Sequence, residues 1–165
     1  MNRCLDELRR QFEEAGVKYQ VVDHPIAYTA QRVADLEDVP GHSFAKSVVV
    51  FVDDRPSLLA LPAPHVVDFD ALCRELNARH ARLAAEAEFG GLFPDCDVGA
   101  MPPFPGPAAL PVYLDRAILE QPEIVFEAGS HTQSVRMRTE DYVAVARPRV
   151  LSFARESVGE PPRSR

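Results

Sequence analysis

Three short segments carry residue types that could bind a carbonyl group or an oxyanion. Lys46 precedes an apolar run, so it would lie at the mouth of a buried strand as a fixed cation. The loop 99–104 offers backbone N–H groups from Gly99 to Met101, held in place by the prolines that follow. In the third segment, His131 follows a strand and lies among small and polar residues. Each segment also has an ordinary interpretation, as a solvated lysine, a proline-rich spacer and a loop histidine.

A thiol nucleophile is the weaker alternative. Cys96 and His131 could form a thiol–imidazole pair, but no third group that would orient the histidine is evident. The sequence contains neither a glycine-rich nucleotide-binding motif nor the GxSxG motif of α/β-hydrolases. We expect no cofactor, and we expect no metal site because four histidines fall at no ligand spacing relative to the cysteines: His24, His42, His65 and His80.

Length, charge and cysteine usage limit the class of protein. A chain of 165 residues, 46% of them apolar, can build one core without disulfides or structural metals. A net charge of −7 disfavours broad binding to a phosphate backbone, so any contact with nucleic acid must be small and local. Three widely spaced cysteines argue against a disulfide framework. Because no apolar stretch suits a signal peptide or a membrane span, we expect a cytoplasmic protein with reduced thiols.

Hydrophobic spacing predicts the elements that must position these residues. Leu5, Leu8 and Phe12 recur at helical spacing before Gly16, which predicts a helix over about 3–15. The β-branched run 47–52 and the run 58–61 flank a turn signal and predict a central hairpin. Thr29, Asp68 and Thr139 are expected to cap helices, the one after Asp68 with Cys73 on its buried face. Further short strands are expected at 19–22, 82–85, 112–114, 124–126 and 135–137, and a short helix at 86–93.

The proline-rich segment 94–111 has neither helical nor strand periodicity, which predicts a rigid, shaped loop. The fold class that follows is α/β, with a mixed, mostly antiparallel sheet of six or seven strands and helices packed around it. We expect one domain over 1–154. Residues 155–165 are charged and contain proline, which predicts a flexible C-terminal tail.

Taken in order, five motifs resemble those of the YbaK/ProX family. They are His24-Pro25, Tyr28-Thr29-Ala30, Ala45-Lys46-Ser47, the segment 99–104 and the segment 128–132. The similarity covers about residues 5–148. The family comprises free-standing aminoacyl-tRNA deacylases and the editing domain inserted in bacterial prolyl-tRNA synthetases, so the resemblance implies a YbaK-like fold and a trans-editing hydrolase that deacylates mischarged aminoacyl-tRNA.

The resemblance also implies roles for particular residues. Lys46 would hold the 3′-terminal nucleotide or its ester, the Gly99–Pro103 loop would shape the aminoacyl pocket, and His131 would lie near the ester. Lys46, Gly99 and His131 are therefore the expected catalytic residues, with water rather than a protein group as nucleophile. The expected substrate-binding residues are Tyr28, Ser47, Ala100, Met101, Pro102, Pro103, Gly129 and Ser130.

The resemblance leaves two points open. The expected partner is the 3′ acceptor end of aminoacyl-tRNA, and a synthetase as a further partner is left open. Ser47 and its neighbours do not specify which amino acid is removed. A non-catalytic module that binds an acceptor end or a synthetase through the same pocket is the alternative, because a shared fold does not by itself establish turnover.

Overall fold

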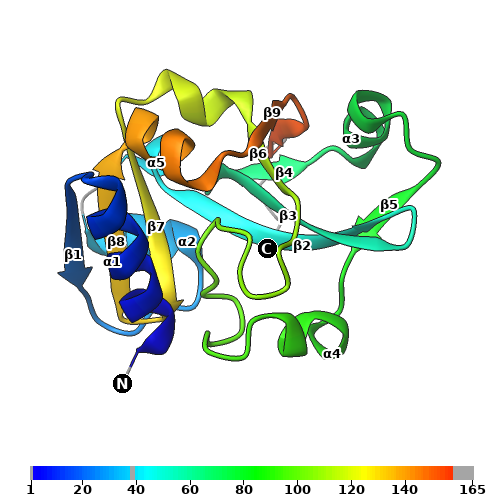
Figure 1. The fold of residues 1–165 in the computed structure, drawn as a ribbon. Coiled ribbons are helices and arrows are strands. Elements are labelled where there is room, and N and C mark those ends of the chain that lie inside the picture. The colour runs from blue at the N-terminus through cyan, green and yellow to red at the C-terminus, as the bar shows by residue number, and fades with distance from the viewer. Residues whose placement is uncertain (1, 38–39, 158–165) are drawn as a thin grey trace, which may run out of the picture.

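The computed structural model describes residues 2–37 and 40–157, and its two larger sheets meet near the middle of the molecule (Figure 1). The larger sheet has the strand order β5-β2-β3-β6-β9. Its centre is the predicted hairpin, formed by β2 (Ala45–Val52) and β3 (Arg55–Pro62). The turn residues Asp53 and Asp54 both have positive φ, which matches the twist of a tight hairpin.

The outer strands of this sheet are short. β5 (Ala81–Leu83) pairs antiparallel with β2, whereas β6 (Val112–Asp115) pairs parallel with β3, and β9 (Arg149–Leu151) pairs parallel with β6. Helix α3 (Phe69–Leu76) begins at Asp68, whose side chain accepts a hydrogen bond from the N–H of Ala71 as expected of a cap. Its Leu72 is buried against β2 and β3, whereas Cys73 is only partly buried.

The second sheet is antiparallel, with the order β1-β8-β7. It consists of β1 (Tyr19–Asp23), β8 (Gln133–Arg138) and β7 (Glu123–Ser130). Helices α1 (Arg3–Ala15) and α5 (Thr139–Ala146) cover one of its faces (Figure 1). Leu5, Leu8 and Phe12 of α1 and Tyr142 of α5 are buried there, which gives the domain its main core.

One isolated parallel bridge joins the two sheets. It pairs Phe44, just before β2, with Val125 in β7. Helix α2 (Ala30–Leu36) follows β1 and packs beside this bridge, because Val33 and Ala34 share a buried cluster with Phe44 and Val125. The bridge therefore fixes where the beginning of β2 lies relative to β7.

Helix α4 (Glu86–Phe89) is followed by a 3-10 turn at Gly90–Leu92. The segment from this turn to β6 forms the shaped loop that the prolines predict. It crosses in front of β2 and β3 in Figure 1. Phe93, Met101 and Leu110 anchor it by packing against Val49 and Leu58 of the hairpin. No helix or strand is found between residues 93 and 111, all of which the structure describes.

The structure corrects three expectations. A single sheet of six or seven strands is wrong: the described residues form ten strands in three sheets, the third being the pair β4 (His65–Val67) and β10 (Ala154–Glu156). Thr139 does not cap α5, because Arg138 takes the cap position and the Thr139 hydroxyl donates to the Gln121 carbonyl. The boundary expected at residue 154 falls inside β10, and residues 158–165 of the expected tail lie outside the described residues.

In the described part of the chain, no helix has the length and apolar character needed to cross a membrane.

Candidate active site

The bridge between the sheets brings Lys46 and Glu127 to the same place. Phe44 and Val125 are paired in parallel, and the next residues on the same sides of their strands are Lys46 and Glu127. Both side chains line one small pocket, with a volume of about 270 Å³. The pocket is bounded by Thr29, Ala30, Phe44, Ala45, Lys46, Ser47, Ala63, Gly99, Met101 and Glu127.

Lys46 is a half-buried cation at this pocket. It forms no ion pair with any described residue. Burial lowers the pKa of its ammonium group, because the charged form loses hydration. A partly dehydrated ammonium without a protein partner is well suited to bind an electron-rich oxygen of a ligand.

Glu127 is a buried carboxyl on the opposite side of the bridge. Its residue is 6% exposed, and its Oε1 atom has no hydrogen-bond partner. Burial raises the pKa of this carboxyl to about 8, with further contributions from the negative charges of Glu37 and Asp97. The free protein therefore keeps Glu127 largely protonated at neutral pH.

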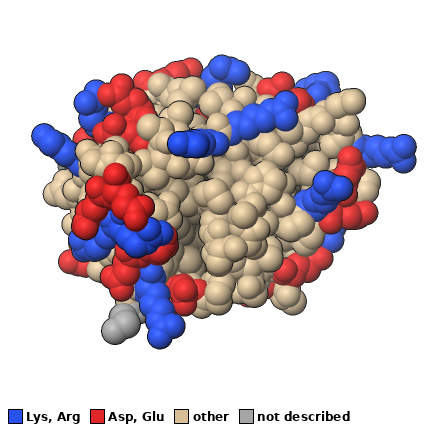
Figure 2. Space-filling model, viewed as in Figure 1, with Lys and Arg blue, Asp and Glu red and all other residues tan. Residues whose placement is uncertain are grey.

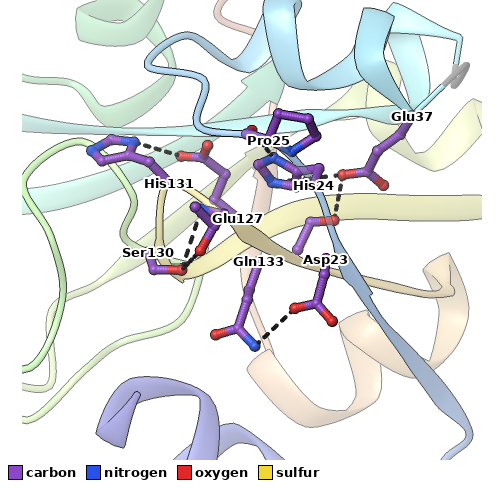
Figure 3. A network of polar contacts seen from close by, with 10 residues as sticks. Asp23, His24, Pro25, Glu37, Glu127, Ser130, His131 and Gln133 are labelled. Atoms are coloured by element: carbon purple, nitrogen blue, oxygen red, sulfur yellow. Dashed lines mark hydrogen bonds and ion pairs between the residues drawn. The ribbon is translucent and has the colours of Figure 1, made fainter. Parts of the chain in front are cut away.

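His131 lies at the rim, between Glu127 and the proline-rich loop. Its Nε2 atom lies 2.9 Å from the carbonyl oxygen of Val98, and because a carbonyl can only accept, Nε2 carries the proton. In the neutral ring, Nδ1 is then an acceptor, and it lies 3.8 Å from Oε2 of Glu127 (Figure 3). The ring of Tyr28, 72% exposed, packs against the imidazole with centroids 4.8 Å apart.

Backbone hydrogen bonds fix the conformation of the proline-rich loop around Gly99. Gly99 has φ +85°, and the Cβ atom that it lacks would lie 3.7 Å from Cε1 of His131. The N–H of Ala100 donates to the Asp97 carbonyl at 3.0 Å, so the expected array of three amide donors is reduced. Among the described residues, the amides of Gly99 and Met101 have no acceptor, and they are the donors left to a ligand.

Several predicted binding residues lie outside the pocket lining. Ala100, Pro102 and Pro103 are buried behind it, and the carbonyl of Pro103 accepts a hydrogen bond from the Tyr142 hydroxyl at 2.7 Å. These residues therefore brace the loop. The structure places them behind the lining, and their role as direct substrate contacts stays a prediction.

Gly129 and Ser130 also lie elsewhere, along a separate depression beside α1. The N–H of Gly129 donates to the Ala100 carbonyl at 2.8 Å, and its carbonyl accepts from Asp97 at 2.8 Å, so Gly129 connects β7 with the loop. The Ser130 hydroxyl is engaged with Thr132 within the turn. Of the predicted residues, the structure brings Lys46, Ser47, Gly99 and Met101 together in the pocket, with His131 and Tyr28 at its rim.

A second buried histidine–carboxylate contact lies behind Glu127 (Figure 3). Nε2 of His24 is 3.8 Å from Oε2 of Glu37, and that oxygen also accepts a hydrogen bond of 2.5 Å from the Ser134 hydroxyl. His24 is held in turn by a contact of 2.8 Å between its Nδ1 and the Pro25 carbonyl. This network ties the end of α2 to β1 and β8, and it places the Glu37 carboxyl near enough to act on Glu127.

The pocket lining also contains six residues that the sequence reasoning did not predict as site residues: Glu127, Thr29, Ala30, Phe44, Ala45 and Ala63. Glu127 carried a usable signal, because a charged residue inside the apolar run of β7 is unusual unless it is partnered or functional.

The thiol–imidazole alternative finds no geometric support. Cys96 lies beside Cys4, and contact with Cys96 together with burial raises the pKa of the Cys4 thiol. No hydrogen bond joins Cys96 to His131 in the described part of the chain. A search of the same residues finds no group of three or more side chains placed to hold a metal ion.

Charges on the face shown in Figure 2 lie mainly over α1 and around the edges, whereas the middle carries few. On α1, positive and negative groups are interleaved, as in the pairs of Arg10 with Glu7 and Glu14. This face presents no broad basic surface, which agrees with a small, local contact to nucleic acid.

This chain is similar to several known proteins in sequence and in fold. A multifunctional Ser/Thr-tRNA deacylase, ProXp-y, from Escherichia coli (strain K12) is 29% identical over 147 residues, which covers 86% of this chain and 87% of the relative. A crystal structure described as a candidate trans-editing enzyme for prolyl tRNA synthetase superposes with a TM-score of 0.81 at 21% identity, over 94% of this chain and 99% of the other. A scaffold protein from computational epitope grafting gives a TM-score of 0.80 at 19% identity, with the same coverage. The model of the aminoacyl-tRNA editing domain matches residues 24–145, and the chain belongs to that family.

Proposed function

We propose that this protein is a trans-editing deacylase that hydrolyses the ester bond of mischarged aminoacyl-tRNA, using Lys46 and the Gly99–Pro103 loop to orient the reaction. The observation that carries the proposal is the half-buried ammonium of Lys46, which has no ion-pair partner among the described residues and lies at a small pocket. Gly99 and Met101, whose amides have no acceptor among the same residues, also line this pocket. Membership of the editing-domain family and the deacylase activity named for the E. coli relative support it.

In the proposed reaction, water attacks the ester carbonyl and the 3′ oxygen of the terminal ribose leaves. Lys46 binds the oxygen on which negative charge develops, and the two loop amides act as further donors. An aminoacyl ester is already activated, so positioning and charge stabilisation can supply much of the acceleration without a covalent intermediate. The substrate's own 2′-hydroxyl is a group that can help to orient the water.

The rim is suited to the terminal nucleotide. Tyr28 presents an exposed aromatic ring braced by His131, and exposed aromatic rings bind single-stranded bases by stacking. We propose that His131 positions the ester end of the substrate through its fixed orientation. The acceptor end of tRNA would then be the part recognised, in the cytoplasm, with or without a synthetase partner.

The volume of the pocket favours small aminoacyl groups. We propose alanyl, seryl, threonyl and cysteinyl esters as substrates. The threonyl ester is included because the E. coli relative is named for Ser/Thr-tRNA. The test is to incubate the protein with a panel of mischarged tRNAs and to measure loss of the ester. Hydrolysis of at least one small aminoacyl ester is expected. Binding across the panel without turnover would instead favour a non-catalytic acceptor-end module.

A further inference from the structure

Glu127 is the buried acid that the proposed reaction leaves without a role. It lines the pocket together with Lys46, yet no ion pair joins the two residues. Its Oε1 atom has no hydrogen-bond partner. Leaving a buried polar atom unpaired destabilises a protein by about 1–3 kcal/mol, and the cost is larger when the group is charged. An unpaired carboxyl oxygen in a residue that lines a pocket indicates a missing hydrogen-bond partner, which a ligand can supply.

The groups around Glu127 restrict what that hydrogen-bond partner can be. Glu37 and Asp97 are acidic, and their negative potential favours a cation over an anion in the space beside the carboxyl. The Nδ1 atom of His131 lies 3.8 Å from Oε2 of Glu127, which is beyond hydrogen-bond distance, so it does not satisfy the carboxyl. Lys46 borders the same pocket without pairing and is available for another part of the ligand.

We propose that Glu127 binds the α-amino group of the aminoacyl moiety. This inference rests on the proposed function, because the amine belongs to the ester that the pocket would hydrolyse. The pocket then has two ends of opposite charge, with Lys46 at the carbonyl oxygen and Glu127 at the amine.

Proton balance favours this pairing. In the free protein Glu127 is largely a neutral acid, and an aminoacyl ester can enter as the neutral amine. The proton then moves from the carboxyl to the amine, giving a carboxylate and an ammonium that are hydrogen-bonded to each other. The pair is neutral in total before and after the transfer, so it enters a poorly hydrated pocket without burying a net charge.

The experiment compares each aminoacyl-tRNA with its deaminated counterpart, in which a hydroxyl replaces the α-amino group at nearly the same size. Alanyl- and seryl-tRNA are treated with nitrous acid to give the α-hydroxyacyl esters, and kcat/KM is measured for wild type, Glu127→Gln and Glu123→Gln. Glu123 is the matched control because it is an exposed glutamate on the same strand. The ratio of the two esters is compared between proteins, which cancels their different intrinsic reactivities.

We expect the preference of wild type for the amino ester to fall by about 10- to 100-fold in Glu127→Gln, as for loss of a hydrogen bond to a charged group, and to persist in Glu123→Gln. An unchanged preference in Glu127→Gln overturns the inference. Loss of discrimination between seryl and alanyl esters, with the amino preference intact, also overturns it, because Glu127 would then bind the side-chain hydroxyl of serine.

A second measurement on wild type avoids any dependence on folding of the variant. A stable analogue with the seryl group linked to the 3′ end of tRNA through an amide competes with the ester, beside the same analogue lacking its α-amino group. Stronger competition by the amine, by about tenfold or more, is expected. Equal competition, while the ester is still hydrolysed, overturns only this inference, whereas absence of hydrolysis of every ester overturns the proposed function.

Discussion

Nε2 of His131 lies 2.9 Å from the carbonyl oxygen of Val98, and this contact joins two loops that are more than 30 residues apart in the sequence. The imidazole thereby braces the backbone just before Gly99 and directs Nδ1 towards Glu127. Its position suits a residue that holds the pocket in shape rather than one that exchanges protons with water.

Replacing His131 by alanine should therefore slow deacylation moderately, by about tenfold, since a misplaced loop weakens donors without removing them. The measurement is single-turnover hydrolysis, with His80→Ala as control because His80 is exposed and distant from the pocket lining. A loss of about 10³-fold or more would instead indicate that the imidazole takes part directly in proton transfer.

Replacing Gly129 by alanine should destabilise the fold. Gly129 has φ +94°, a backbone conformation that alanine rarely adopts. An added Cβ would also lie 2.5 Å from Cβ of Cys4, which is a steric clash. We expect a loss of about 2 kcal/mol or more in the free energy of unfolding, measured by denaturant titration. Gly90→Ala is the matched control, because nothing lies within 4 Å of its added Cβ and its φ is −55°. Equal stability of the two variants would contradict the close approach of α1 to β7.

Replacing Glu127 by glutamine should change how stability depends on pH. The pKa of Glu127 is raised to about 8 in the folded state from an ordinary 4.5, so between these values the folded protein binds more protons than the unfolded chain. The contribution of this acid to stability is full below about pH 4.5 and is lost as pH rises through about 8. Glutamine removes that loss, so Glu127→Gln should gain stability relative to wild type, by up to a few kcal/mol, between about pH 5 and 9.

The check is the free energy of unfolding of both proteins across that range, with Glu123→Gln again as control. The other charged or titratable groups that face Glu127 are His131, Glu37, Asp97 and Lys46, and all three proteins contain them. A difference between Glu127→Gln and wild type that does not grow with pH would show that folding does not raise the pKa of this carboxyl.

Neither a chelator nor Cys96→Ser should lower the deacylation rate. Cys96 lies beside Cys4 and makes no hydrogen bond with His131 in the described part of the chain, so its thiol lacks a base. Cys73→Ser, on α3, is the matched control. The readout is ester hydrolysis, and a specific loss with Cys96→Ser or with chelator would revive a thiol nucleophile or a metal-dependent reaction.

The parts of the fold that could be predicted are those set by local pattern. The hairpin of β2 and β3 follows from its β-branched run and turn residues, and Lys46 at its start follows with it. Asp68 capped a helix as expected because its acceptor lies at the right distance from the apolar stripe. Sequence spacing also identified the loop around Gly99.

The rest depends on contacts between distant segments. Glu127 joins the pocket only because Phe44 pairs with Val125 across two sheets, and no local pattern specifies that bridge. For the same reason, the sequence does not reveal that Pro103 and Ser130, which neighbour pocket residues along the chain, lie outside the pocket lining. The strand β10 was missed because it is short and pairs only with β4.

Lys46→Ala tests the central claim most directly, because the proposed chemistry depends on this ammonium. The chain has one other lysine, and Lys18→Ala is the matched control because Lys18 is exposed. Lys46→Arg should restore little activity, since the longer, planar guanidinium displaces the charge by about an ångström.

The measurement is single-turnover hydrolysis of a mischarged tRNA at saturating enzyme, with circular-dichroism melts to confirm folding. We expect Lys46→Ala to lose about 10²-fold or more in rate, as when one transition-state donor is removed, while Lys18→Ala keeps the wild-type rate. A folded Lys46→Ala protein that hydrolyses the ester at the wild-type rate would contradict the proposed site.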